Sequence, residues 1–244
     1  MTSGHPLILS LFPGIGLLDL AFEQEWPEAC IVRGPDLIFN RLSDIRDFHP
    51  PAGVFWGLIG GPPCQEHSQL KFLNPLAGKH GNLIPEFERV VGEAHPVWFL
   101  MENVVQAPVP QISGYWAARN VVLNNRWLGE AQQRVRRFSF GVRCDVSPGG
   151  IALDVTPDLV LFESGEWAPT VLGGHGPVGR GRGYTSNLTI EQMCRLQGVQ
   201  SDFLSEAPFT AHGKRQVLGN AVPLPLGRAI ARAVRRAMSD GGDV

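Results

Sequence analysis

Short, mainly apolar runs alternate along the chain with segments whose apolar residues follow a helical period. The apolar runs predict buried strands at 7–12, 29–33, 54–59 and 97–101, and a late strand pair at 119–123 and 136–142. Helical spacing covers 17–23 and 83–94. Because strands that alternate with helices are typical of α/β folds, this pattern predicts a doubly wound, mostly parallel sheet with helices on both faces.

The pattern changes after residue 142. Residues 143–187 are rich in glycine and proline and contain only short apolar runs, which predicts a small, loop-rich second domain. Helical spacing returns at 188–198, and a strong helix is expected at 225–238. We therefore expect a core domain at 1–142, a loop-rich region at 143–187, and a segment at 188–244 that returns to the core domain.

Composition narrows the possible classes of protein. The 244 residues include 43% hydrophobic and 18% charged residues, with a net charge of −2, which is ordinary for a globular protein. No apolar run approaches the ~20 residues of a membrane span, and the N-terminus lacks a basic segment before an apolar one, so we expect a cytoplasmic protein. The four cysteines lie far apart without zinc spacing, so neither a disulfide framework nor a structural metal is expected.

Cys64 lies directly after an apolar run, on the turn Gly60-Gly-Pro-Pro. Such a turn places the thiol at the carboxyl edge of the sheet, where α/β proteins bind ligands. A helix that begins just after Cys64 would favour its thiolate form. The alternative for Cys64 alone is a buried structural thiol.

The segment Phe12-Pro-Gly-Ile-Gly16 follows the first strand and opens a helix, as a turn that closely approaches a nucleotide-like cofactor does. Asp36, after the second strand, is positioned for a ribose diol, and Asp44 for an adenine amino group. Taken alone, the turn is equally compatible with strand–helix packing and the two acids with a solvated surface.

Six segments, taken in order, resemble the motifs of the cytosine-5 DNA methyltransferases. They are Phe12–Gly16, Gly61–Gln65, Glu102–Val104, Gln132–Arg136, Leu188–Gly198 and Gln216–Pro223. The resemblance runs from residue 8 to about residue 232 and leaves 143–168 largely uncovered. Other interpretations of single motifs remain, since 102–103 could cap a strand end and 132–137 could be a charged strand edge.

This resemblance implies methyl transfer from S-adenosyl-L-methionine to C5 of cytosine in DNA, with S-adenosyl-L-homocysteine as the product. Cys64 would add to C6 of a cytosine flipped out of the duplex, because C5 becomes nucleophilic only after that addition. Glu102 would act as a neutral acid toward N3, which requires a raised pKa. Arg134 and Arg136 would support the base.

The resemblance also implies two further sets of contacts. The cofactor residues would be Phe12, Gly14, Ile15, Gly16, Leu17, Asp36, Asp44, Ile45, Pro62, Leu83, Asn220, Ala221 and Val222. The DNA contacts would be Gln65, Ser68, Arg180 and Arg182. We expect a monomer that acts on DNA, in a restriction–modification setting, with no membrane and no metal.

The chain departs from the family pattern where the target-recognition domain belongs. The interval from Gly141 to Leu188 is short, and Glu66-His67 replaces the Gly-Phe that commonly follows the nucleophile motif. We therefore expect a reduced target-recognition region and a short or degenerate recognition sequence of roughly two or three base pairs. Two alternatives stay open: cytosine-5 methylation of RNA, and a catalytically silent accessory that binds DNA.

Overall fold

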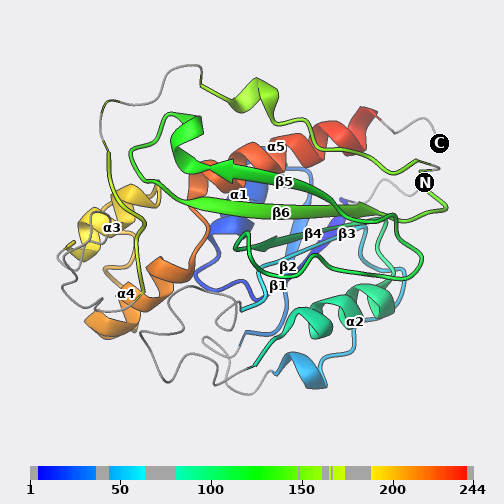
Figure 1. The fold of residues 1–244 in the computed structure, drawn as a ribbon. Helices are drawn as coiled ribbons and strands as arrows, with labels where there is room; N and C mark the ends of the chain where they lie inside the picture. Colours follow the sequence, from blue (N-terminus) through cyan, green and yellow to red (C-terminus); the bar gives the residue numbers. More distant parts are fainter. Residues whose placement is uncertain are drawn as a thin grey trace.

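The computed structural model describes residues 5–36, 44–63, 81–147, 149–160, 165, 167–173 and 188–240. Its centre is a six-stranded sheet with the strand order β2-β1-β3-β4-β6-β5 (Figure 1). The strands are β1 (Leu7–Leu11), β2 (Cys30–Arg33), β3 (Gly57–Gly60), β4 (Trp98–Asn103), β5 (Arg119–Asn124) and β6 (Val135–Val142). All six strands expected from the apolar runs are confirmed, with shifted ends.

The sheet is mixed. Strands β1 to β4 pair in parallel, whereas β6 runs antiparallel to both of its neighbours, β4 and β5. Because β6 is antiparallel, its first residues reach the edge at which the parallel strands end. The segment 132–136 therefore lies at the same edge of the sheet as the ends of β3 and β4.

Helices cover both faces of the sheet. The helices α1 (Leu17–Glu25) and α5 (Leu224–Asp240) pack against each other on one face, and α2 (Ile84–Ala94) covers the other (Figure 1). Successive residues of β4 alternate between the two cores: Trp98 packs with α1 and α5, and Phe99 packs with α2. The predicted doubly wound α/β architecture is confirmed.

A third, smaller apolar cluster lies beside the sheet. It joins α3 (Ile190–Leu196) and α4 (Ala211–Asn220) to Val171. The helix expected at 188–198 is confirmed as α3, which begins with a capping box at Thr189. The sequence did not predict α4, because only Val217 and Leu218 of its residues are buried and the rest gives no clear apolar stripe.

The arginines of α5 form ion pairs within the protein. Their partners are two carboxylates near the end of α1 and one in η4 (Thr156–Asp158): Arg228 and Arg232 with Glu25, Arg235 with Glu28, and Arg232 and Arg236 with Asp158. Leu153 also joins the α1–α5 core. The first part of the loop-rich region is therefore docked on α5, while the proposed domain boundaries remain predictions.

Gly57 provides a test of the core packing. A methyl group at this position would lie 2.2 Å from the Trp98 ring. That ring stacks on Phe22 and Trp26 and meets the edge of Trp56, so it has no room to shift. Gly57→Ala should lower the free energy of unfolding by about 1–3 kcal/mol in urea titrations.

The matched control is Gly92→Ala in α2, where an added methyl group meets nothing within 4 Å. This control should stabilise the protein by about 0.5–1 kcal/mol, because alanine favours the helix over glycine. Equal stability of the two variants would contradict the packing described for Trp98.

Candidate active site

The turn after β1 has a left-handed backbone at three positions, with φ of 55° at Phe12, 55° at Gly14 and 76° at Gly16. Its amides are bonded within the protein: Gly14 N donates to Asp36 Oδ2 at 2.7 Å, and Gly16 N donates to Pro13 O at 2.8 Å. A methyl group on Gly14 would meet nothing within 4 Å, so there is open space beside the turn. The structure thus joins Gly14 and Asp36, as the sequence predicted.

This arrangement indicates what kind of ligand fits beside the turn. Dinucleotide-binding turns direct backbone amides at a phosphate. Here the Gly14 amide is bonded to a carboxylate, which would repel a phosphate and attract a cation. The carboxylate beside the turn therefore fits a positively charged ligand group better than a pyrophosphate.

A buried acid supports the turn from within α1. Asp19 is completely buried and accepts hydrogen bonds from Ser10 Oγ at 2.5 Å and Arg33 Nε at 2.9 Å. Burial raises the pKa of the Asp19 carboxyl, while its bonds to Ser10 and Arg33 act in the opposite direction. The sequence analysis missed Asp19, although an acid among apolar helix residues was an available signal.

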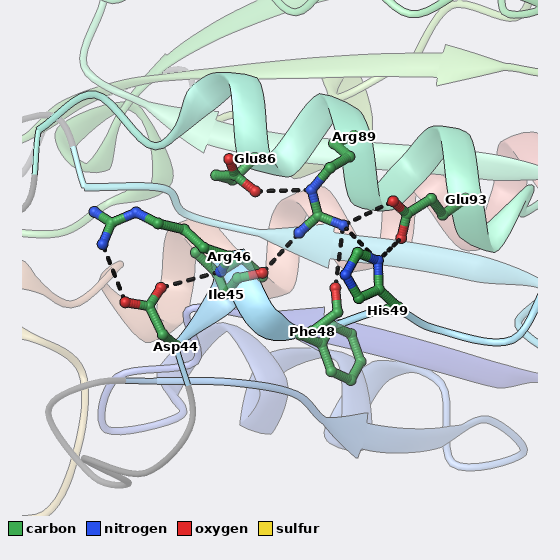
Figure 2. Close-up of polar contacts among 8 residues, drawn as sticks. All are labelled: Asp44, Ile45, Arg46, Phe48, His49, Glu86, Arg89 and Glu93. Atoms are coloured by element: carbon green, nitrogen blue, oxygen red, sulfur yellow. Dashed lines mark hydrogen bonds and ion pairs between the residues drawn. The ribbon is translucent and has the colours of Figure 1, made fainter.

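The other cofactor residues belong to two segments. Asp44 precedes η1 (Ile45–Asp47) and accepts hydrogen bonds from the Arg46 backbone amide at 3.0 Å and from Arg46 Nη1 at 3.1 Å (Figure 2). Ile45 and Leu83 are both buried in the core cluster under α2, with Phe12 packed at its border. Leu17 is buried at the start of α1.

The end of β3 lies against the end of β4. Asn103 Nδ2 donates to Pro62 O at 3.2 Å, and a methyl group on Gly61 would lie 3.1 Å from Glu102 Oε2. The turn that leads to Cys64 is therefore adjacent to Glu102. Cys64 itself, like the predicted DNA contacts Gln65, Ser68, Arg180 and Arg182, lies outside the described residues.

Glu102 is buried and forms an ion pair with Arg136, whose Nε lies 2.9 Å from Glu102 Oε1. Glu102 is paired directly with Phe138 across the β4–β6 ladder, so Arg136 is its diagonal neighbour on the same face. Burial raises the pKa of Glu102, although the charges of Arg136 and Arg134 oppose this shift. The direction agrees with the neutral acid that the sequence predicted.

Arg134 is almost completely buried, and its guanidinium contacts backbone carbonyls. It donates to Val171 O at 3.1 Å and to Gly219 O and Ala221 O, both at 2.9 Å. These contacts direct its guanidinium at the segment before and after Asn220, while the predicted support of the base stays a prediction. The motif spacing could not separate Arg134 from Arg136.

Two glutamines extend the contacts of Arg134. Gln132 Nε2 donates to Leu196 O at 2.5 Å and to Gln197 Oε1 at 3.1 Å, and Gln132 Oε1 accepts from Val171 N at 3.2 Å. Gln197 in turn donates to the Ala221 carbonyl at 3.2 Å. Gln132, Arg134 and Gln197, which we call the buried latch, thereby fix α3, α4 and the segment 219–221 to the start of β6.

The segment carrying Asn220, Ala221 and Val222 connects α4 to α5. Asn220 is exposed, whereas Val222 is buried in the α1–α5 core. Ile15 of the glycine turn packs against the third cluster. The structure thus brings the glycine turn next to the α3–α4 cluster, as the predicted cofactor site requires.

Comparison with known proteins agrees with this geometry. Residues 7–108 match the family model described as C-5 cytosine-specific DNA methylase. This part of the chain is therefore similar to the cytosine-5 DNA methylases. The match contains the glycine turn, Cys64 and Glu102.

Similar proteins extend the resemblance beyond the matched residues. The chain is 32% identical over 166 residues to the type II methyltransferase M.FnuDI of Fusobacterium nucleatum, covering 57% of this chain and 48% of that protein. It is 30% identical over 173 residues to M.NgoPII of Neisseria gonorrhoeae, covering 59% of this chain and 50% of that protein. The matched part therefore spans about half the length of these relatives.

The fold has solved counterparts. The crystal structure of a Spodoptera frugiperda DNMT2 mutant superposes with a TM-score of 0.68 and 12% identity, covering 94% of this chain and 99% of that one. At this identity the likeness concerns the fold. Among the described residues of the chain, no helix is long and apolar enough to cross a membrane, and no cluster of His, Cys, Asp and Glu is arranged to hold a metal.

The raised pKa of Glu102 predicts a pH dependence of stability. Above the ordinary pKa of 4.5, the unfolded chain ionises this carboxyl more readily than the folded chain does. Wild-type stability is therefore lost progressively as the pH rises from 4.5 through the raised pKa, and Glu102→Gln abolishes this loss. The difference in unfolding temperature, Glu102→Gln minus wild type, should accordingly be more positive at about pH 7.5 than at about pH 4.5. An equal difference at both pH values would contradict the assigned burial effect.

Proposed function

We propose that this protein transfers a methyl group from S-adenosyl-L-methionine to C5 of cytosine in DNA, and that it acts as a monomer. The observation that carries this proposal is the position of Glu102. Its buried carboxyl lies beside Arg136 and against Gly61, in the turn that leads to Cys64. The matches to cytosine-5 DNA methylases support the same activity.

The described residues fit the cofactor. Gly14 and Gly16 have no side chain that would keep a ligand away from the turn, and Asp36 faces the turn. Ile45 and Leu83 would supply an apolar wall. When bound, S-adenosyl-L-methionine supplies an electrophilic methyl group. The acidic surroundings of the turn would attract its positive charges.

The chain's own residues would activate the base. The Cys64 thiolate forms a bond to C6, which pushes electrons toward N3 and O2 of the ring. Glu102 donates its proton to N3, while the Arg136 guanidinium stabilises the negative charge on the ring. C5 is then nucleophilic and takes the methyl group.

The reaction then reverses the addition. A base removes the C5 proton, the Cys64–C6 bond breaks, and the electron pair returns to sulfur as the thiolate. N3 returns its proton to Glu102, so the enzyme is regenerated. Burial raises the pKa of Glu102 and so favours the protonated carboxyl that the reaction needs, against the opposing charges of Arg136 and Arg134.

Arg134 would act indirectly. Its bonds to Gly219 and Ala221 fix the segment that contains Asn220, which is expected to contact the cofactor. We therefore assign Arg134 a positioning role and leave contact with the base to Arg136.

The proposal is tested with DNA that carries 5-fluorocytosine in place of cytosine. Wild-type protein should form a covalent adduct, because fluorine at C5 blocks the final elimination, and mass spectrometry would locate the bond at Cys64. Cys64→Ala should form no adduct and should transfer no methyl group to unmodified DNA. An adduct with Cys64→Ala would show that the nucleophile is a different residue, and RNA modified faster than duplex DNA would favour the RNA alternative.

The recognition sequence should be short. Each bidentate contact with a base contributes about 1–3 kcal/mol of discrimination, and the interval from Gly141 to Leu188 offers little length for several such contacts. Bisulfite sequencing of DNA from cells that express the protein should show methylation at sites with roughly two or three defined base pairs. Replacing Arg180 and Arg182 by alanine should weaken DNA binding and leave cofactor binding unchanged. A strict site of five or six base pairs would contradict this prediction.

A further inference from the structure

Arg89, on α2, lies at the centre of a polar cluster beneath the predicted adenosine end of the cofactor site (Figure 2). We propose that Arg89 is a positioning residue that fixes the two apolar walls of this end, Ile45 and Leu83, relative to each other. The inference rests on the proposed use of S-adenosyl-L-methionine, and it concerns a residue outside the six sequence motifs.

The guanidinium of Arg89 bonds to the backbone at the first residue of η1 and at the residue that follows it. Arg89 Nη2 donates to Ile45 O at 2.7 Å, and Nη1 donates to Phe48 O at 3.1 Å. These partners lie 44 and 41 residues away in the sequence, so one side chain ties α2 to a distant segment. The carbonyl of Ile45 belongs to the same residue whose side chain forms the predicted cofactor wall.

The segment 44–48 has little backbone structure of its own. Its internal backbone bonds are Asp47 N to Asp44 O and Phe48 N to Ile45 O, both at 3.2 Å. A single 3₁₀ turn with such bonds is a weak element. The bonds from Arg89 therefore act together with the core packing of the Ile45 side chain in fixing this segment.

Two carboxylates fix the orientation of Arg89. Glu86 Oε2 accepts from Nε at 2.8 Å, and Glu93 Oε1 accepts from Nη1 at 2.8 Å. The second carboxylate oxygen of Glu93 lies 3.0 Å from His49 Nδ1, which extends the cluster to the end of the bound segment. Because a planar guanidinium has five donors in a fixed fork, arginine can meet all of these acceptors at once, whereas lysine cannot.

The other wall belongs to the same helix. Leu83 immediately precedes α2, and its carbonyl accepts from Phe87 N at 3.1 Å in the first helical turn. Leu83 and Ile45 share the core cluster under α2. Arg89 thus links the helix that follows Leu83 to the backbone of Ile45, and through this link it would hold the two apolar side chains at a fixed separation for an adenine ring.

The test is binding of S-adenosyl-L-homocysteine, and of adenosine alone, to the full chain by isothermal titration calorimetry. Arg89→Lys should weaken both ligands by about tenfold, because lysine keeps the charge near Glu86 and Glu93 but loses the bonds to both carbonyls. The loss of affinity should be as large for adenosine as for S-adenosyl-L-homocysteine, because Ile45 and Leu83 would face the adenosine half of the ligand. The kcat at saturating cofactor and the Kd for DNA should stay within about twofold of wild type.

The matched control is Arg236→Lys on α5, since Arg236 also pairs with a carboxylate and donates to a carbonyl, in this case Asp158 and Asp154 O. Arg236 belongs to α5, which lies on the other face of the sheet from α2 (Figure 1). The Arg236→Lys variant should bind both ligands as the wild type does. If Arg89→Lys proves too unstable to titrate, Glu86→Gln combined with Glu93→Gln keeps both carbonyl bonds but loosens the guanidinium. That variant should weaken adenosine by about threefold.

The outcomes separate the two proposals. Wild-type protein that binds neither ligand would contradict the proposed cofactor. Wild-type binding together with unchanged affinity in Arg89→Lys, or in the double variant where Arg89→Lys cannot be titrated, would overturn the role of Arg89 and leave the proposed function intact. A loss of DNA binding equal to the loss of adenosine binding would also overturn it, because that result indicates a general loss of structure.

Discussion

The buried latch formed by Gln132, Arg134 and Gln197 is the constraint on which the arrangement of the site depends. A buried guanidinium is costly unless its donors are bonded, and the two terminal nitrogens of Arg134 donate to three backbone carbonyls from two separate segments. Those carbonyls belong to α4, to the link into α5, and to the segment at Val171. The α3–α4 cluster has a small core of its own, so these polar contacts, rather than a large apolar interface, determine where it lies.

Close backbone contact makes the latch specific. A methyl group on Gly219 would lie 2.0 Å from Gly173 N, so the end of α4 and the segment at 172–173 touch without any intervening side chain. Only glycine permits this approach, and only at this distance can the carbonyls of Val171 and Gly219 share one guanidinium. The close contact between Gly219 and Gly173 and the hydrogen bonds from Arg134 therefore both fix the end of α4 beside the segment 171–173.

The sequence predicted the sheet well because each strand carries its own signal. Buried strands such as 97–101 are continuous apolar runs, whereas Glu102 was found because Glu102–Val104 resembles a motif of the family. The helix α4 was missed because its stability comes from packing and from its Thr210 cap rather than from an apolar stripe. The roles of Arg134 and Arg89 could not be predicted, since their partners lie 37 to 87 and 41 to 44 residues away and are mostly carbonyls, which every residue possesses.

The antiparallel direction of β6 determines the path that the chain takes after this strand. An antiparallel strand begins at the ligand edge and ends at the opposite edge, where Val142 is paired with Trp98 and Arg143 bonds to His95. The chain must then return along the length of the strands before Ala168 can form a β-bridge with Gln132. Part of that path is fixed on α5 through Leu153 and Asp158. Much of the described interval after β6 therefore serves to return the chain to the edge at which β6 began.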